Sequence, residues 1–195
     1  MVKEQLTQTI EDVAHRKAKK FSLWLGMIGM FMMFAALSSG FIVYTQGGID
    51  KGIKTILPSE FIYSTILIVI SSVTMHLAYR ASKRAEHKQQ KIFLTLTFLL
   101  GIGFFFMQLD AWSILTARGV YFINTNASQS FIYIFTGMHL AHILGGLLLL
   151  MRAFIGTLKN IPHINNVFRM ELATLFWHFL DVLWIYIYVF LLLNQ

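Results

Sequence analysis

The sequence predicts an all-α, polytopic membrane protein built as a bundle of five transmembrane helices. Hydrophobic residues make up 56% of the 195 residues and charged residues only 13%, a composition too apolar for a water-soluble domain of this length. Five apolar runs approach or reach the roughly 20 residues that a helix needs to cross a bilayer. These runs are continuous and do not alternate with polar residues, so each is expected to satisfy its backbone hydrogen bonds within a helix.

The first two apolar runs are bounded by charged residues. Residues 21–44 follow the basic pair Lys19 and Lys20 and contain no charged side chain. Residues 61–79 lie between Glu60 and Arg80, and their one ionisable side chain of this kind is a histidine, His76. Both runs are long enough to span the hydrocarbon core, so each is predicted to be a transmembrane helix.

The remaining three runs complete the predicted bundle. Residues 92–109 and 131–151 carry no aspartate, glutamate, lysine or arginine, and residues 172–193 carry one such residue, Asp181. Both prolines of the chain lie between runs, so no predicted helix is interrupted by a proline.

The chain is expected to form a single transmembrane domain, residues 21–195, preceded by an arm, residues 1–20. The arm carries apolar side chains at helical spacing, Leu6, Ile10 and Val13, beside acidic and basic ones. This pattern predicts a cytosolic amphipathic helix. The apolar run that follows is too long for the hydrophobic part of a cleavable signal peptide.

Lysine and arginine residues divide unevenly between the two sides of the predicted bundle. The arm, the second connection and the fourth connection carry thirteen of the 16, whereas the opposite side carries Lys51, Lys54 and Arg118. Cytoplasmic segments of membrane proteins are the basic ones, so the N-terminus is predicted inside and the C-terminus outside. The net charge of +7 is explained by this topology, without nucleic acid as a partner.

Ionisable residues inside a predicted span are candidates for a structural or functional role. An aspartate at a helix centre costs about 2.5–3.5 kcal/mol on insertion scales, so Asp181 is expected to face protein and not lipid. His178 precedes Asp181 by three residues and Glu171 precedes His178 by seven, which places all three along one side of the last helix. They form a polar stripe on an otherwise apolar helix.

The fourth run carries a second polar pair, His139 and His142, also three residues apart. The fourth and fifth helices are predicted to run antiparallel. Counting inward from their basic ends brings His142 level with Asp181, and Arg152 level with Glu171. Two contacts are therefore predicted: a hydrogen bond between His142 and Asp181, and an ion pair between Arg152 and Glu171.

Two other functions stay open from these residues alone. Membrane haems are commonly held by histidines on different helices, so His76, His139, His142 and His178 could belong to a haem-binding cytochrome b. His178 and Asp181 could also relay protons in a small proton-coupled transporter. The simpler interpretation is structural, with the polar residues satisfying one another and the backbone. The chain has no cysteine to supply a thiolate ligand.

Two segments of the sequence carry a family resemblance. Glu171 with WHFLDVLW at 177–184, and TGMHLAHILGG at 136–146, resemble the closing helices of subunit III of the haem-copper terminal oxidases. These are the cytochrome c and quinol oxidases of respiratory chains. The resemblance extends over residues 23–193, and the predicted topology is similar to that of the family's shorter, five-helix bacterial form.

The chain departs from the family pattern in its first helix. The family carries a Ser-Glu pair shortly after the first Trp-Leu pair, and this chain has Gly29 and Met30 there. The third helix ends with an acid displaced by one residue, Asp110. Any role of the family's helix-buried glutamate is therefore not transferred to this chain.

The resemblance implies an accessory, non-redox subunit of a respiratory haem-copper oxygen reductase in the bacterial cytoplasmic (inner) membrane. It implies no catalytic residue and no metal ligand in this chain, since haem and copper would lie in the partner catalytic subunit I. The implied partners are that subunit, other oxidase subunits, alone or within a respiratory supercomplex, and bound phospholipid. The implied work is to stabilise the catalytic subunit, bind lipid and support proton uptake while oxygen is reduced to water.

These inferences select two groups of residues. A structural polar brace is expected from His139, His142, Glu171, His178 and Asp181. Lipid is expected at Arg152, Trp177 and Trp184.

Overall fold

The computed structural model of the chain is a bundle of five helices within the residues that it describes, which confirms the predicted all-α membrane fold. The described residues are 2–47, 56–123, 126–159 and 162–194, with side chains from residue 11 onward. Each of the five helices is long and apolar enough to cross a membrane. In chain order they are α1 (Val2–Gln46), α2 (Glu60–Lys83), α3 (His87–Ala117), α4 (Ala127–Leu158) and α5 (His163–Leu193).

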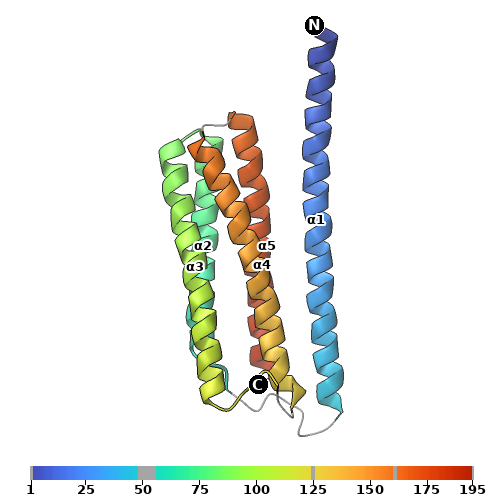
Figure 1. Cartoon of the computed structure of the whole chain (residues 1–195), viewed down its shortest axis with the longest axis vertical. Helices are drawn as coiled ribbons and strands as arrows, with labels where there is room; N and C mark the ends of the chain where they lie inside the picture. The colour runs from blue at the N-terminus through green and yellow to red at the C-terminus, as the bar shows by residue number, and fades with distance from the viewer. Residues whose placement is uncertain (1, 48–55, 124–125, 160–161, 195) are drawn as a thin grey trace.

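Each helix is longer than the apolar run that predicted it, because backbone hydrogen bonding continues through the polar residues that flank a membrane span. The largest extension is in α1, which runs without a break through the predicted arm and the first span (Figure 1). The predicted boundary at residue 20 is therefore not a break in secondary structure. Leu6 and Ile10 of the predicted amphipathic pattern lie outside the described side chains, and Val13 is 46% exposed.

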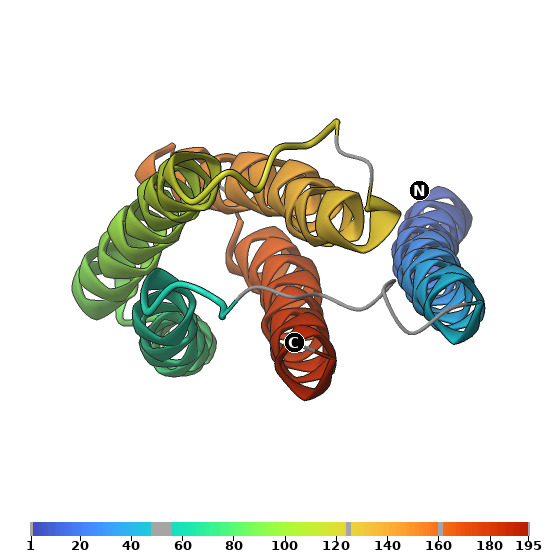
Figure 2. The same cartoon turned by 90° about the horizontal axis from the view of Figure 1, so that it is seen from below.

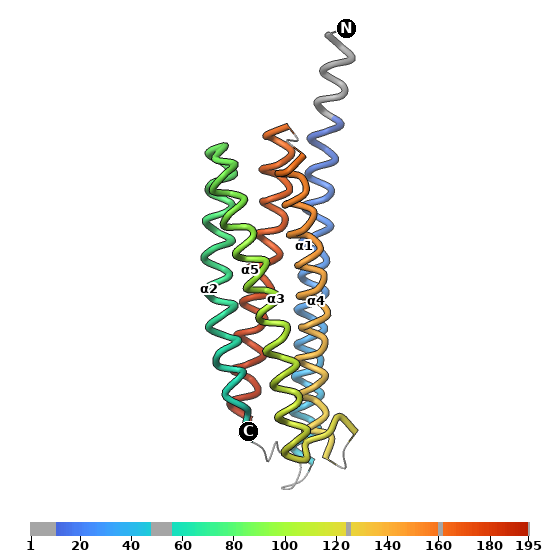
Figure 3. Tube along the Cα trace, turned by 60° about the vertical axis from the view of Figure 1, so that its left-hand side comes forward, coloured from blue at the N-terminus to red at the C-terminus, as the bar shows by residue number. Residues whose placement is uncertain are grey.

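The helices are arranged in two rows, with α1 at one edge of the bundle. Figure 2, which views the bundle from one end, shows α3, α4 and α1 along one side, and α2 and α5 along the other. Among the described residues, α1 contacts α4 and α5 but neither α2 nor α3. Figure 3 likewise shows α1 beside α4, with α2 at the far edge of the bundle.

A single stripe of side chains attaches α1 to the bundle. Met27, Phe34 and Phe41 are buried and lie seven residues apart, the spacing by which one helix packs lengthwise against another. The ring of Phe41 contacts Phe131 of α4 and Phe190 of α5, at centroid distances of 5.6 and 5.4 Å. The other side of α1 leaves large apolar side chains exposed: Phe21, Trp24, Leu25, Ile28, Phe31 and Met32.

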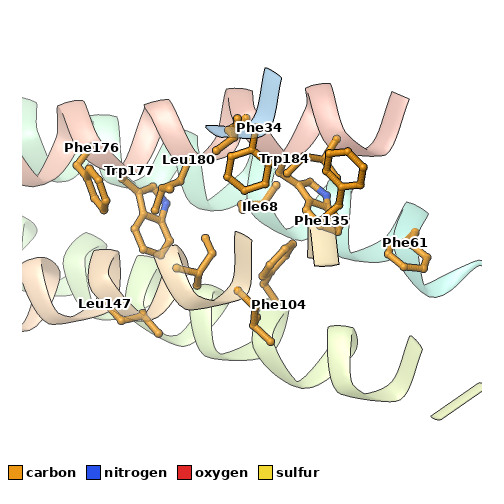
Figure 4. Close-up of a cluster of buried hydrophobic side chains, with 14 of the residues drawn as sticks. Phe34, Phe61, Ile68, Phe104, Phe135, Leu147, Phe176, Trp177, Leu180 and Trp184 are labelled. Atoms are coloured by element: carbon orange, nitrogen blue, oxygen red, sulfur yellow. The ribbon is translucent and has the colours of Figure 1, made fainter. Parts of the chain in front are cut away.

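The core is organised around two tryptophans of α5 (Figure 4). Trp177 lies between Gly101 of α3 and Gly146 of α4. A Cβ atom on Gly101 would lie 2.8 Å from Cη2 of Trp177, and one on Gly146 would lie 3.2 Å from its Cε3. Trp184 contacts Phe104 of α3 edge to face, with 4.9 Å between the ring centroids. The two glycines let α3 and α4 approach α5 closely enough to enclose the indole.

The two ends of the bundle differ in charge. The helix α1 begins at the same end as the α2–α3 and α4–α5 connections, and the C-terminus lies at the other end (Figure 1). We call the first of these the basic end, since it carries Arg16, Lys20, Arg80, Arg152 and Arg169. This arrangement agrees with the predicted topology, and the side of the membrane that the basic end faces stays a prediction.

Candidate functional site

The predicted polar pair of α5 lies where α5 meets α2. Nδ1 of His178 lies 2.7 Å from Oγ of Ser72 and 3.7 Å from Oδ2 of Asp181. Asp181 is buried, and neither of its carboxylate oxygens has a hydrogen-bond partner among the described residues. The ring centroid of His76 lies 6.1 Å from that of His178. The structure thus brings His178 and Asp181 together and adds Ser72, which sequence reasoning did not select.

His139 occupies an aromatic site inside the bundle. Its ring is fully buried between Phe104 and Trp184, at centroid distances of 5.8 and 5.1 Å. Neither ring nitrogen has a hydrogen-bond partner within the described part of the chain. His139 therefore contributes to the interior by ring packing, and not by a hydrogen bond that the structure shows.

The predicted hydrogen bond between His142 and Asp181 is wrong. Nδ1 of His142 lies 2.6 Å from the carbonyl oxygen of Met138, one turn back along α4. Its ring faces α1, with 6.0 Å between the centroids of His142 and Phe34. Depth counting matched the levels of the two residues but could not give their directions around the helix axes. Three residues of an α-helix turn through about 300°, which leaves His139 and His142 about 60° apart around α4. Here that difference turns His139 toward Trp184 and His142 toward Phe34.

The predicted ion pair between Arg152 and Glu171 is also replaced. Oε1 of Glu171 instead lies 2.5 Å from Nζ of Lys20, and Arg16 donates to the side-chain oxygen of Asn165 at 3.1 Å. Both contacts join α1 to the first turns of α5. The depth count compared α4 with α5 only, whereas the cation that pairs with Glu171 is Lys20 of α1.

The two tryptophans expected to contact lipid are fully buried inside the bundle. Nε1 of Trp177 donates to Oγ of Ser71 at 3.0 Å, and Nε1 of Trp184 donates to Oγ1 of Thr65 at 2.9 Å. The expectation of lipid at these indoles is therefore corrected: each is enclosed by protein. Their spacing of seven residues places both on the face of α5 that turns toward α2 and α3.

Arg152, the third residue expected to contact lipid, is exposed and lines two hollows at the basic end. The larger hollow, of about 580 Å³, lies between α1, α4 and α5. Its lining includes five basic side chains, one acidic side chain and a patch of apolar ones: His15, Arg16, Lys19, Arg152, Arg169, Asp12, Leu149, Phe168 and Leu172. The second hollow, of about 420 Å³, shares Arg152 and Arg169 with the first. We call the larger one the basic hollow.

The arrangement can pair charges, donate hydrogen bonds and accept an anion at the basic hollow. Within the part of the chain that the structure describes, no group of three or more histidine, cysteine, aspartate or glutamate side chains is placed to hold a metal ion. The rings of His76 and His178 are neighbours, whereas His139 packs against Trp184 and His142 faces α1.

Comparison with protein families decides the identity of the bundle. Residues 2–194 match the model of the family described as cytochrome c oxidase subunit III. The chain belongs to this family. The assignment covers almost all of the chain, including both segments on which the resemblance rested, and the accessory role is consistent with it. The two alternatives, a cytochrome b and a small transporter, are not favoured.

Individual relatives of this subunit III chain come from both branches of the oxidases. It is 29% identical over 175 residues to cytochrome c oxidase subunit 3 of Bacillus sp. (strain PS3), which covers 88% of this chain and 84% of that one. It is 33% identical over 173 residues to cytochrome bo(3) ubiquinol oxidase subunit 3 of Pseudomonas aeruginosa, covering 86% and 81%. The ubiquinol oxidase subunit 3 of Buchnera aphidicola from Acyrthosiphon pisum is 28% identical and covers 96% and 92%. This chain is thus similar to subunit 3 of cytochrome c oxidases and of ubiquinol oxidases alike.

Sequence reasoning on this subunit III chain selected acids, histidines and tryptophans and missed the hydroxyl residues that contact them. Ser71 accepts the indole N–H of Trp177, and Ser72 contacts His178. Hydroxyl residues recur on α2 with the seven-residue spacing that marks one helix face. That recurrence is the signal by which they could have been found: Ser64, Thr65, Ser71 and Ser72.

Proposed function

We propose that this subunit III chain packs against the haem- and copper-bearing subunit I of a respiratory oxidase in a bacterial cytoplasmic membrane. There it stabilises subunit I, holds anionic phospholipid and supports proton uptake. Its bacterial relatives, which are named as oxidase subunits, support the partner and the membrane. The basic hollow is the observation that carries the lipid part of the proposal.

The basic hollow has the chemistry that a phospholipid needs. Cationic side chains from three helices meet over an apolar floor that includes Leu149, Phe168 and Leu172. An anionic headgroup would pair with the cations, and the acyl chains would lie against the floor and the adjoining apolar surface. Basic side chains near an anionic membrane surface contribute about 1 kcal/mol each to such binding.

Arg152 and Arg169 are the two residues that we propose to hold the phosphate group. Both line the basic hollow and the second hollow beside it, so a headgroup between the two would contact both. A guanidinium group presents paired N–H donors that match the oxygens of a phosphate.

The polar brace is proposed in the form that the contacts support. Glu171 joins α5 to α1 through Lys20, and His178 joins α5 to α2 through Ser72. Asp181 lies behind His178 within the bundle. His139 and His142 stay in the proposal through their ring contacts, with Trp184 and Phe34 respectively.

The support for proton uptake is proposed from titratable groups at the basic end. Asp12 and His15 line the basic hollow. Carboxylate and imidazole groups bind and release protons, so they can hold protons near the surface where uptake begins. Haem and copper would supply the oxygen chemistry in the partner subunit, and no redox step is assigned to this chain.

The lipid proposal is tested by replacing both arginines, Arg152→Gln with Arg169→Gln, in the intact oxidase. Removing two cations at about 1 kcal/mol each is expected to weaken the affinity for anionic phospholipid about thirtyfold. The measurement is the number of anionic phospholipids retained per complex during a detergent wash, by native mass spectrometry.

The matched control removes two exposed cations at the same end but away from the hollow, Arg84→Gln with Lys88→Gln. Equal loss of lipid in the two double variants would contradict a specific role for the hollow. The wider proposal fails if deletion of the chain leaves oxidase turnover, proton pumping and long-term activity all unchanged.

A further inference from the structure

Two of the intramembrane polar side chains face out of the bundle. The side chain of His178 is 35% exposed, and His76 on the neighbouring helix α2 is exposed as well. Their ring centroids are 6.1 Å apart. Ionisable residues within a membrane span normally face the bundle interior or a polar cavity. An imidazole pair on the outer surface therefore needs something other than lipid against it.

The depth of His178 places it within the hydrocarbon layer and not at the headgroups. It lies seven residues beyond Glu171, whose bond to Lys20 lies at the basic end. At 1.5 Å per residue, this separation is about 10 Å along the helix axis. A polar group at that depth has no water to satisfy it if the surface is bare.

The hydrogen bonding of His178 leaves one ring nitrogen available. Nδ1 lies against Ser72 and Asp181 on the inner side, at 2.7 and 3.7 Å. The carboxylate of buried Asp181, whose oxygens have no hydrogen-bond partner within the described ranges, lies on this same inner side of the ring. Nε2 lies on the other edge of the ring and is the nitrogen that a second molecule can reach.

The surface around the imidazole pair suits another helix. Exposed β-branched side chains continue along α2 and α5 from the two histidines at intervals of three and four residues. They are Ile62, Ile66, Val69 and Val73 on α2, and Val182, Ile185 and Val189 on α5, each 41–66% exposed. β-Branched side chains have few rotamers, so they lose little conformational entropy when another helix packs against them. By contrast, the groove between α3 and α4 is lined by apolar side chains except for Thr95, as a surface facing acyl chains would be.

Resting on the proposed function, we infer that this α2/α5 face docks a transmembrane helix of the haem-bearing oxidase subunit. The face is defined by His76, His178, Val73, Val182 and Ile185. The docking helix presents a hydroxyl, amide or carboxyl group to Nε2 of His178, and apolar side chains to the β-branched ridges. The polar pair fixes the register of the two helices, because a hydrogen bond within lipid has few alternative partners.

The docking is tested by photo-crosslinking in the intact oxidase. A photoreactive amino acid is placed at Val73 or Val182, and, as matched controls, at Leu99 of α3 or Leu148 of α4. The four positions are 57%, 66%, 59% and 67% exposed. We expect crosslinks to the haem-bearing subunit from Val73 and Val182, and lipid adducts from the controls.

Three results would overturn the docking. They are crosslinks from the α2/α5 face to lipid only, crosslinks to a second copy of this chain, and crosslinks to the haem-bearing subunit from the control positions alone. Co-purification of the haem-bearing subunit with the unmodified chain is scored separately. Its absence would overturn the proposed function, whereas normal co-purification without crosslinks from Val73 and Val182 overturns only the docking.

The hydrogen bond is tested by His178→Phe and His178→Gln. Loss of one interhelical hydrogen bond of average strength for a membrane protein is expected to lower recovery of the haem-bearing subunit about threefold in detergent. The glutamine variant, which keeps a polar group, is expected to retain most of the recovery. Equal recovery with phenylalanine, glutamine and histidine would overturn the hydrogen bond, and the crosslinks test the face itself if either variant fails to fold.

Discussion

Adding a single methyl group at Gly101 should destabilise the bundle, because the site has no room for it. The new Cβ atom would lie 2.8 Å from Cη2 of Trp177 and 3.0 Å from Cδ2 of Leu147. Carbon atoms at optimal separation are about 3.5–4.0 Å apart, so both contacts are repulsive. The indole cannot easily retreat, since its N–H bonds to Ser71 and Gly146 lies against its other side.

The expected size of the effect follows from two opposing terms. Overpacking a well-packed core by a methyl group typically costs about 1–3 kcal/mol. Replacing a helical glycine by alanine returns about 0.5–1 kcal/mol of backbone entropy. The net destabilisation by Gly101→Ala is therefore about 0–2.5 kcal/mol, and the close contact with Trp177 places it on the destabilising side.

Gly145→Ala is the matched control, because nothing lies within 4 Å of the Cβ that it would add. Thermal unfolding of the chain in the purified complex can be monitored as loss of the chain from the soluble complex. The midpoint temperature should be lower for Gly101→Ala than for the unmodified chain. The midpoint for Gly145→Ala should be unchanged or slightly higher. Equal shifts for the two variants would refute the packing argument. A further check is Trp177→Phe, which removes the indole atoms of the clash and leaves only the contact with Leu147, so that Gly101→Ala should cost less in that background.

Two further predictions concern polar residues. His139→Phe should leave stability unchanged or raise it by up to about 1–3 kcal/mol, because it removes two buried nitrogens without partners from an aromatic site. The same thermal assay measures it, and a clear loss of stability would show that a hydrogen bond to His139 exists in the complex. Lys20→Gln and Glu171→Gln should show a coupling energy of about 0.2–1 kcal/mol in a double-mutant cycle, since both side chains are 34–45% exposed. That coupling should shrink in high salt, and a salt-independent coupling would contradict a surface ion pair.

The sequence was sufficient for the membrane fold because crossing a bilayer is a property of one segment at a time. Each apolar run has to satisfy its own backbone, so composition and length locate the helices without knowledge of their neighbours. The ends were less predictable. The polar residues of 163–171 continue α5 well before the apolar run begins, since hydrogen bonding does not stop at the membrane surface.

Contacts between helices were predicted less well, because they depend on direction around each axis as well as depth. The count along the helices places His142 and Asp181 at matching depths, yet the ring of His142 faces α1. Glu171 likewise found its partner on α1, a helix that contributes to only one edge of the bundle. Both errors share a physical cause. A count of residues along two antiparallel helices gives the depth of each residue along the helix axis. It does not give the direction of the side chain around that axis, or show whether a third helix supplies the partner.

The α5 segment at 177–184, part of the motif on which the family resemblance rested, combines residues with different structural roles. Trp177, Leu180 and Trp184 face inward, and burial against α2, α3 and α4 accounts for them. Asp181 is also inside, but its unpartnered carboxylate makes sense only beside a group that can share a proton or charge with it, and His178 is the group within reach. Of the two ionisable residues within 177–184, His178 is the one that packing within the chain leaves partly exposed. An aspartate that supports an outward-facing imidazole explains why both belong to a span where each alone would be costly.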